Sequence, residues 1–223
     1  MPAANHRSPI RRTAYPKVLK KLRLAVLIAS LTVALGASSL AQSHMVDGAP
    51  TAASGQAFDV AAGYSYLSMQ IPGAGRLNLG GLDASGRVDF SDHWAATIDS
   101  SYVRASDVLS TGHQGYMLSL LAGPEWHPLE QGRTRFFLRA LGGVGMVDGV
   151  EPLSSADYLH GFVTRPSYAA GGGIERSIVG PFGVRVAADY VRTEFANSAA
   201  ALQGQNNIRL TASFVFRLKD RKY

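Results

Sequence analysis

The side chains that most often carry chemistry are few in this 223-residue chain and lie far apart. There is no cysteine, which excludes a disulfide, a thiol nucleophile and a cysteine metal site. No two of the six histidines share a short spacing, so the sequence predicts no metal site. The histidines are His6, His44, His93, His113, His127 and His160. The glycine-rich stretches 142–145 and 171–173 lack the strand-to-helix context of a phosphate-binding loop, so we expect no cofactor.

Charged residues give the strongest pattern, because thirteen of them lie at odd-numbered positions in stretches that alternate in hydropathy. They are Asp59, Asp83, Asp89, Asp99, Glu125, Glu175 and Asp189, with Arg87, Arg135, Arg139, Arg185, Arg209 and Arg217. The even-numbered positions at the centres of these stretches carry no charge. Successive side chains of a strand face opposite sides, so a shared parity puts all thirteen on one face. We expect the seven carboxylates and six guanidinium groups to pair, with bidentate contacts.

Eight stretches with this period of two, separated by turn residues, are the elements that would position the charges. The clearest is the last, in which apolar or small residues at every even position from Ile208 to Phe216 alternate with a largely polar row. No convincing amphipathic helix interrupts the series. The expected strands are 57–69, 76–90, 94–104, 115–126, 134–146, 167–176, 183–193 and 206–218.

Charged and apolar side chains lie on opposite faces of the expected strands. This separation indicates which face contacts lipid and which faces a polar interior. Thirteen charges on the buried face of a soluble sandwich would cost several kcal/mol for each unpaired ion. If the charges faced water, the apolar faces would still need a core. A membrane barrel satisfies both faces, because its outside meets lipid and its lumen is polar. We therefore expect an all-β fold, an eight-stranded antiparallel up-and-down transmembrane β-barrel whose paired charges plug a narrow lumen.

The N-terminus has the features of a secretory signal peptide. Seven basic residues precede an apolar core at 24–36, and small residues lie just before Gln42. The remaining 15 basic residues face 16 acids, so the mature chain is near −1 and no nucleic-acid partner is expected. The predicted layout is a signal peptide at 1–41, a flexible periplasmic lead-in at 42–56, a barrel at 57–218 and a tail at 219–223. Export of this kind predicts the bacterial outer membrane as the location.

Connections and aromatic residues support this orientation. Short periplasmic turns are expected at 91–93, 127–133 and 177–182, and the longest outer loops at 147–166 and 194–205. Aromatic residues divide into two rings, which is typical of a protein that crosses two membrane interfaces. The periplasmic ring contains Phe58, Phe90, Trp94, Trp126, Phe136, Phe182 and Phe216, and the outer ring contains Tyr66, Tyr102, Tyr116, Tyr168 and Tyr190.

Residues 57–218 resemble the OmpA-like family of small outer-membrane β-barrels. The resemblance is carried by AFDVAAGYSY at 57–66, GRVDFSDHWAATIDSSY at 86–102, TRFFLRALGGVG at 134–145 and NNIRLTASFVFRL at 206–218. The last stretch looks like the C-terminal signal read by the barrel-assembly machinery, which implies that machinery as a partner during biogenesis. Such signals commonly end the protein on an aromatic residue, whereas residues 219–223 follow here.

Three arginines share the lipid-facing parity and lie at the outer ends of their strands: Arg76, Arg104 and Arg192. The guanidinium fork suits phosphate, and the outer leaflet of such a membrane presents phosphorylated lipid A. We expect these residues to contact lipopolysaccharide. Extension of the side chains toward the aqueous interface is the alternative.

Three functions remain open at this level. The first is a structural or surface-interaction role, in adhesion or envelope integrity, with the outer loops as contact surface and an unknown ligand. The second is a narrow or gated pore for small solutes. The third is a lipid A-modifying enzyme, since some barrels of similar size use a Ser/His pair for that chemistry. Ser198 lies at the outer end, but the sequence places neither His113 nor His160 beside it. We therefore expect a non-enzymatic protein without catalytic residues.

Overall fold

The computed structural model describes residues 57–71, 75–108, 112, 114–152, 158–196 and 202–219. The predicted signal peptide and lead-in lie outside the described residues, as does the tail beyond residue 219. Within the described part of the chain, no helix is long and apolar enough to cross a membrane.

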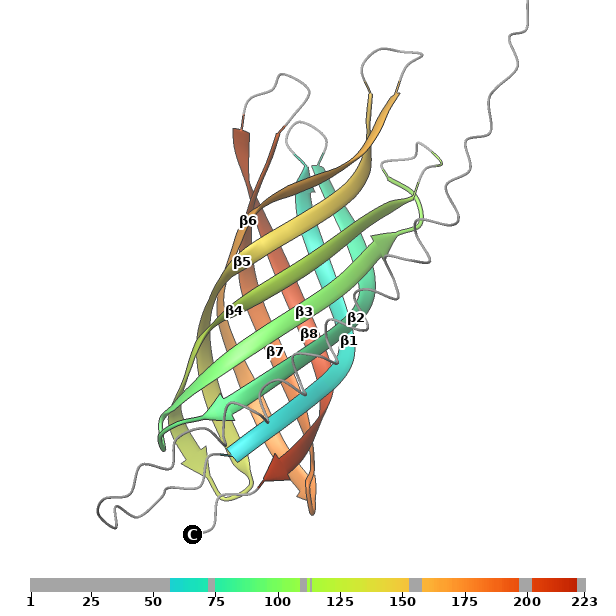
Figure 1. Ribbon diagram of the computed structural model, residues 1–223. Helices are drawn as coiled ribbons and strands as arrows, with labels where there is room; N and C mark the ends of the chain where they lie inside the picture. The colour runs from blue at the N-terminus through green and yellow to red at the C-terminus, as the bar shows by residue number, and fades with distance from the viewer. Residues whose placement is uncertain are drawn as a thin grey trace, which may run out of the picture. The chain divides into compact units, whose positions relative to one another are not determined.

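Eight antiparallel strands close into a barrel (Figure 1). Each strand pairs with its neighbours in sequence, and β1 pairs with β8 to complete the ring. The predicted eight-stranded up-and-down barrel is therefore confirmed. The strands are β1 (Ala57–Ile71), β2 (Gly75–Asp89), β3 (Trp94–Ala105), β4 (Gly115–Gln131), β5 (Thr134–Pro152), β6 (Tyr158–Val179), β7 (Phe182–Ala196) and β8 (Leu202–Lys219).

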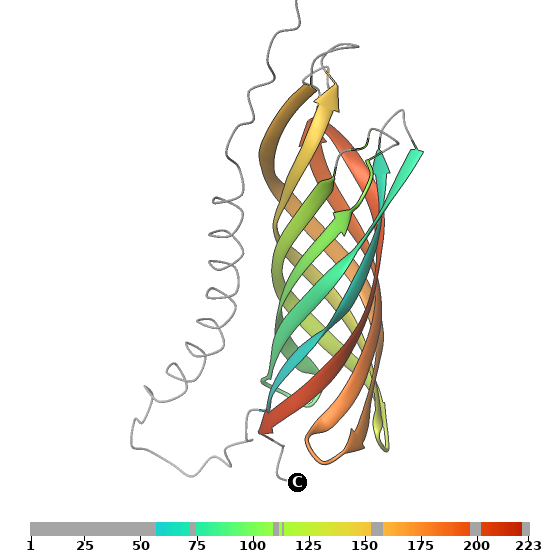
Figure 2. The ribbon, with the colours of Figure 1, turned by 90° about the vertical axis from the view of Figure 1, so that its right-hand side faces the viewer.

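The two ends of the barrel differ. At one, called here the turn end, β1 begins, β8 ends, and short connections join β2 to β3, β4 to β5 and β6 to β7. Gly132 and Gly180 open two of these connections with φ of 59° and 53°, which glycine adopts without steric cost. At the opposite end, called the loop end, the β5–β6 hairpin extends farthest (Figure 2).

The expected turns at 127–133 and 177–182 were too long. Strand β4 continues to Gln131 and β6 to Val179, so that the turns shrink to Gly132-Arg133 and Gly180-Pro181. The ladder between β4 and β5 shifts register between Trp126 and Leu129. Such a bulge breaks the period-two pattern while backbone pairing continues beyond it. The hydropathy pattern therefore ends before the backbone hydrogen bonding of the strand does.

The expected outer loops at 147–166 and 194–205 were also wrong in extent. Strands β5 and β6 remain paired from Val147–Val163 to Pro152–Tyr158. Strands β7 and β8 are paired as far as Ala196 and Leu202. A strand pair that runs beyond the apolar zone has no lipid-facing row, so its sequence does not alternate. Much of the segment expected to be loop is thus a paired two-stranded ladder.

Side-chain parity follows the sequence pattern closely. Even-numbered side chains form the exterior, where Leu82 and Phe214 are 70% and 75% exposed. Odd-numbered side chains point into the lumen along most of the barrel, where Arg87 is 1% exposed and Glu175 is 0%. Beyond the register shifts near the turn end this parity changes, and Leu129 and Val179 are exposed. An apolar exterior around an ionised interior is the reverse of a soluble protein.

Candidate functional site

The lumen contains most of the predicted site residues, and Arg87 on β2 is the hub of those nearest the turn end. Its Nη1 donates to Glu125 Oε1 at 3.1 Å and to Glu175 Oε2 at 2.8 Å. Its Nη2 donates to Asp59, and its Nε lies 3.3 Å from Asp89 Oδ1. One buried guanidinium group therefore joins carboxylates from β1, β2, β4 and β6, because a closed barrel brings distant strands together across its axis.

Glu175 collects further arginines into the same cluster. Arg185 donates to Glu175 Oε2 through Nη2 at 2.6 Å, and Arg217 donates to Oε1 at 2.8 Å. Arg135 donates to Asp89 at 3.2 Å. These eight residues, called the Arg87 cluster, comprise four carboxylates and four guanidinium groups, and their formal charges cancel.

A second cluster lies nearer the middle of the lumen. Arg139 binds Asp189 in a bidentate manner, with Nε–Oδ1 at 3.0 Å and Nη2–Oδ2 at 2.7 Å. Arg209 joins Asp189 to Asp99, with Nη1–Asp99 Oδ1 at 2.6 Å. Two acids and two arginines make this Asp99 cluster neutral as well. Phe137 separates the clusters and lies against Arg139 and Arg185, 5.8 and 5.4 Å from its ring centroid.

Asp83 is the exception among the thirteen predicted lumen charges. The structure pairs the other twelve into the two clusters, but no arginine of the described residues forms an ion pair with Asp83. It accepts one hydrogen bond, from Ser213 Oγ at 3.3 Å, and is 5% exposed. Asp83, the seventh predicted acid of the lumen, therefore has no ion-pair partner among the described residues.

Two lumen residues were missed by the sequence reasoning. His127 was expected in a turn but is 3% exposed, and its Nε2 lies 3.0 Å from Glu125 Oε1. Thr97 donates to the other Glu125 oxygen at 3.1 Å. Both residues have the odd parity of the lumen-facing row, which could have identified them.

The lumen is not polar along its whole length, which corrects the expectation of a purely polar plug. Toward the loop end, buried apolar residues fill it, and they form what is called here the apolar cluster. Its members are Leu67, Met69, Leu79, Val103, Ala105, Met117, Leu121, Leu141, Ala169, Val191 and Phe195. All have odd parity. Apolar residues at odd-numbered positions near the strand ends, such as Leu67 and Met69, could have indicated this filling.

No group of three or more His, Cys, Asp or Glu side chains in the described ranges is arranged to hold a metal ion. Ser198 and His113, weighed as catalytic candidates, lie outside the described residues, and the side chain of His160 is not described.

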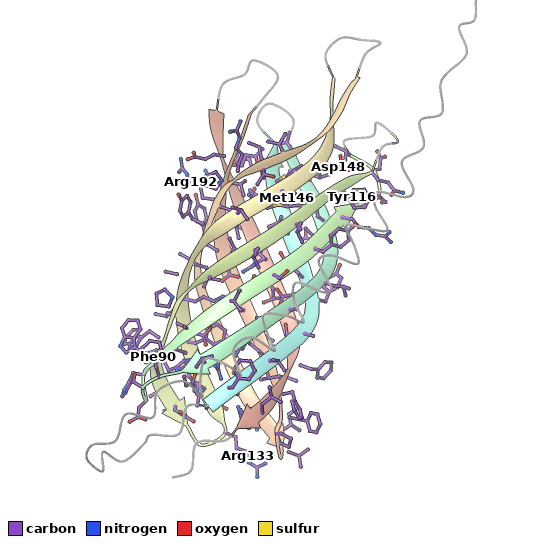
Figure 3. The ribbon with its side chains drawn as sticks, viewed as in Figure 1. Phe90, Tyr116, Arg133, Met146, Asp148 and Arg192 are labelled. Atoms are coloured by element: carbon purple, nitrogen blue, oxygen red, sulfur yellow. The ribbon has the colours of Figure 1, made fainter. Side chains whose placement is uncertain are left out.

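The three exterior arginines do not converge on one site. Arg76 and Arg104 lie on adjacent strands, whereas Arg192 is on β7, with β1 and β8 between it and β2. All three are exposed. Figure 3 shows Arg192 and Tyr116, the cross-strand neighbour of Arg104, on different sides of the barrel toward the loop end.

No protein-family model matches the chain, and no curated protein matches its sequence. Solved structures do match. The Neisserial surface protein NspA superposes with a TM-score of 0.57 at 13% identity, over 73% of this chain and 98% of that protein. The attachment invasion locus protein Ail of Yersinia pestis, in complex with the heparin analogue sucrose octasulfate, gives 0.52 at 17% identity, over 73% and 99%. The chain therefore has the fold of the small eight-stranded outer-membrane barrels, the class that its sequence resembles.

Proposed function

We propose that this chain is an outer-membrane barrel with a closed lumen, which acts through its exterior and its loop end as a structural or surface-interaction protein. The filled lumen is the observation that carries the proposal. The Arg87 cluster, the Asp99 cluster and the apolar cluster occupy it one after another along its axis. Ion pairs and packed apolar side chains both exclude water, so an ion entering at either end meets a barrier.

The exterior supports a membrane location. Large apolar side chains cover it, and exposed aromatic residues lie toward both ends. Phe90, which Figure 3 shows near the turn end, is exposed, as are Trp94 and Phe182 at the starts of β3 and β7. Tyr168 and Tyr190 are exposed toward the loop end of the barrel. Aromatic belts of this kind mark the two interfaces of a bilayer. We infer that the turn end faces the periplasm and the loop end the exterior, since short turns lie on the periplasmic side.

Single-channel recording tests the closed lumen. The refolded protein, residues 42–223, is expected to give no conductance steps in a planar bilayer, while a known porin gives steps under the same conditions. A heat-dependent gel shift on the same sample verifies folding. Discrete, reproducible steps would instead support the alternative of a narrow pore.

The exterior arginines are our proposal for lipopolysaccharide contacts. Arg104 pairs with Gly80 on β2 and with Tyr116 on β4. Because Gly80 has no side chain, nothing from that position covers the Arg104 side chain on the β2 side. Arg192 lies over Gly204, where an added Cβ would be 2.7 Å from its Nη2. An exposed fork at the outer interface can bind a lipid phosphate through two parallel hydrogen bonds.

Replacement of Arg76, Arg104 and Arg192 by alanine tests this contact. We expect less co-purified lipopolysaccharide and a smaller rise in thermal midpoint when lipopolysaccharide is added to lipid bilayers. Arg176 is the matched control, because it is exposed on the same face but at the turn end. If the triple variant retains as much lipopolysaccharide as Arg176→Ala, the contact does not exist.

The non-enzymatic part of the proposal is tested in cells. Overexpression is expected to leave the mass spectrum of lipid A unchanged, whereas a lipid A-modifying enzyme would add a new species. A deletion strain is expected to lose adhesion or envelope integrity. Intact integrity and unchanged adhesion would contradict the structural or surface-interaction role.

A further inference from the structure

Asp83 carries a charge that no ion pair among the described residues balances. The Arg87 cluster and the Asp99 cluster are each neutral, so the thirteen lumen charges sum to −1 with Asp83 as the remainder. Arg139 and Arg209, the central cations, already hold Asp99 and Asp189 between them. A buried, uncompensated carboxylate is costly unless a counter-charge accompanies it.

The strand neighbours of Asp83 supply hydroxyl oxygen atoms and form no ion pair with it. Asp83 and Ser213 both pair with Gly63, which has no side chain to stand between them. Ser65, two residues farther along β1, is 0% exposed, and its Oγ has no hydrogen-bond partner in the described structure. The Oδ2 of Asp83 likewise has none. Two buried oxygen atoms on adjacent strands, two register positions apart, thus have no partner in the described structure, and this part of the lumen is called here the Asp83 layer.

This layer is shielded on the loop-end side. Leu67 follows Ser65 on the same face of β1, and Leu79 precedes Asp83 by four residues on β2. Both belong to the apolar cluster, at 3% and 2% exposure. Ser101, which pairs with Asp83 across to β3, is hydrogen-bonded to Ser119 at 2.6 Å. The layer therefore consists of one carboxylate and several hydroxyl groups beneath an apolar cover.

We propose that Asp83, Ser65 and Ser213 bind one monovalent cation of the size of sodium inside the barrel. Oxygen ligands suit hard cations, and the absence of nitrogen or sulfur donors in this layer disfavours a transition metal. The site contains one carboxylate, so one positive charge makes the site neutral, whereas a divalent ion would leave it with an excess of +1. The cation would act as a structural counter-ion that joins β8, β1 and β2, next to the seam where the barrel closes.

The experiment exchanges sodium for N-methylglucamine at constant ionic strength and measures urea unfolding of the refolded protein in micelles. The unfolding equilibrium constant is expected to fall tenfold for each tenfold rise in sodium above the dissociation constant. Asp83→Asn is expected to abolish this dependence, and Ser65→Ala to weaken sodium binding. Sodium-23 NMR relaxation on the folded wild-type protein gives a direct readout of bound ion.

Asp59→Asn is the matched control. Asp59 is another buried lumen carboxylate, but it is paired with Arg87. Its replacement is expected to lower stability while the sodium dependence remains. Equal stability of the wild-type protein in sodium and N-methylglucamine, with no bound-ion NMR signal, would overturn the proposal and identify a proton as the occupant. If Asp83→Asn fails to fold, the sodium titration of the wild-type protein and the Ser65→Ala variant still decide whether sodium binds in the lumen.

Discussion

At the scale of single residues, the lumen depends on carboxylates that serve several arginines at once. Glu175 is the acidic partner of both Arg185 and Arg217, and it also binds Arg87. Arg87 keeps other acids if Glu175 is lost, but Arg185 and Arg217 have no second ion pair among the described residues. Replacement of Glu175 would therefore leave both Arg185 and Arg217 without an ion pair in the described part of the chain.

Glu175→Gln is expected to lower the free energy of unfolding by about 3 to 5 kcal/mol, because it leaves buried guanidinium groups without a counter-charge. Urea titration followed by the heat-dependent gel shift measures the loss. Glu130→Gln is the control, since Glu130 pairs with Arg135 at 3.4 Å but is 41% exposed, and its effect should stay within about 1 kcal/mol. Equal effects of the two substitutions would show that the buried network does not hold the barrel.

At the scale of strands, the adjacent glycines Gly142 and Gly143 on β5 differ in how much space surrounds them. A Cβ added to Gly143 would lie 2.1 Å from the carbonyl oxygen of Leu120, which is backbone and cannot move aside. A Cβ added to Gly142 would lie 3.7 Å from the ring of Tyr168, an ordinary contact. Gly143 therefore allows the close approach of β4 and β5, whereas an alanine at position 142 would meet no backbone atom of the neighbouring strands.

Gly143→Ala is expected to destabilise the barrel by about 1 to 3 kcal/mol through overpacking, and Gly142→Ala to change stability by less than about 0.5 kcal/mol. Unfolding midpoints of the two variants in the same detergent provide the comparison. A result in which both alanines are tolerated equally would mean that β4 and β5 can separate without loss.

The protruding β5–β6 hairpin is a second feature at this scale. The last pair between β4 and β5 is Tyr116–Asp148, and the last between β6 and β7 is Ser167–Thr193. The described residues 150–152 and 158–160 therefore pair with no strand outside their own hairpin.

Replacement of residues 150–160 by an Asn-Gly turn is expected to leave the unfolding free energy within about 1 kcal/mol of the wild type, because a local hairpin beyond the barrel adds little to global stability. Circular dichroism and the gel shift would measure this. A large loss of stability would show that the hairpin is part of the cooperative barrel.

At the scale of the whole molecule, the barrel is closed by several barriers in series. The apolar cluster lies toward the loop end, and the charge clusters lie between it and the turn end. Removing one barrier leaves the others in the path of an ion.

The double variant Met117→Ala, Phe195→Ala is therefore expected to remain silent in a planar bilayer although it opens the apolar cluster. Its unfolding free energy should fall by about 5 kcal/mol or more, from the lost packing of two buried side chains. Conductance in this variant, with the wild type silent, would show that the ion pairs alone do not seal the lumen.

The sequence by itself determined the all-β architecture, the number of strands and the face to which each side chain belongs. These follow from a period of two, which is local and survives in any strand. Strand ends were less predictable, as β4 and the β5–β6 hairpin show, because backbone pairing continues where hydropathy no longer alternates.

Only the tertiary structure decided which charges meet. Arg209 and Asp99 are 110 residues apart, yet their side chains bond across the lumen. Such contacts depend on the tilt and relative register of all eight strands, and no local pattern encodes these. The same register leaves Asp83 among hydroxyl groups instead of arginines and gathers the apolar odd-numbered residues near one end. The sequence determined that Asp83 faces inward, and closure of the barrel determined that it forms no ion pair within the described chain.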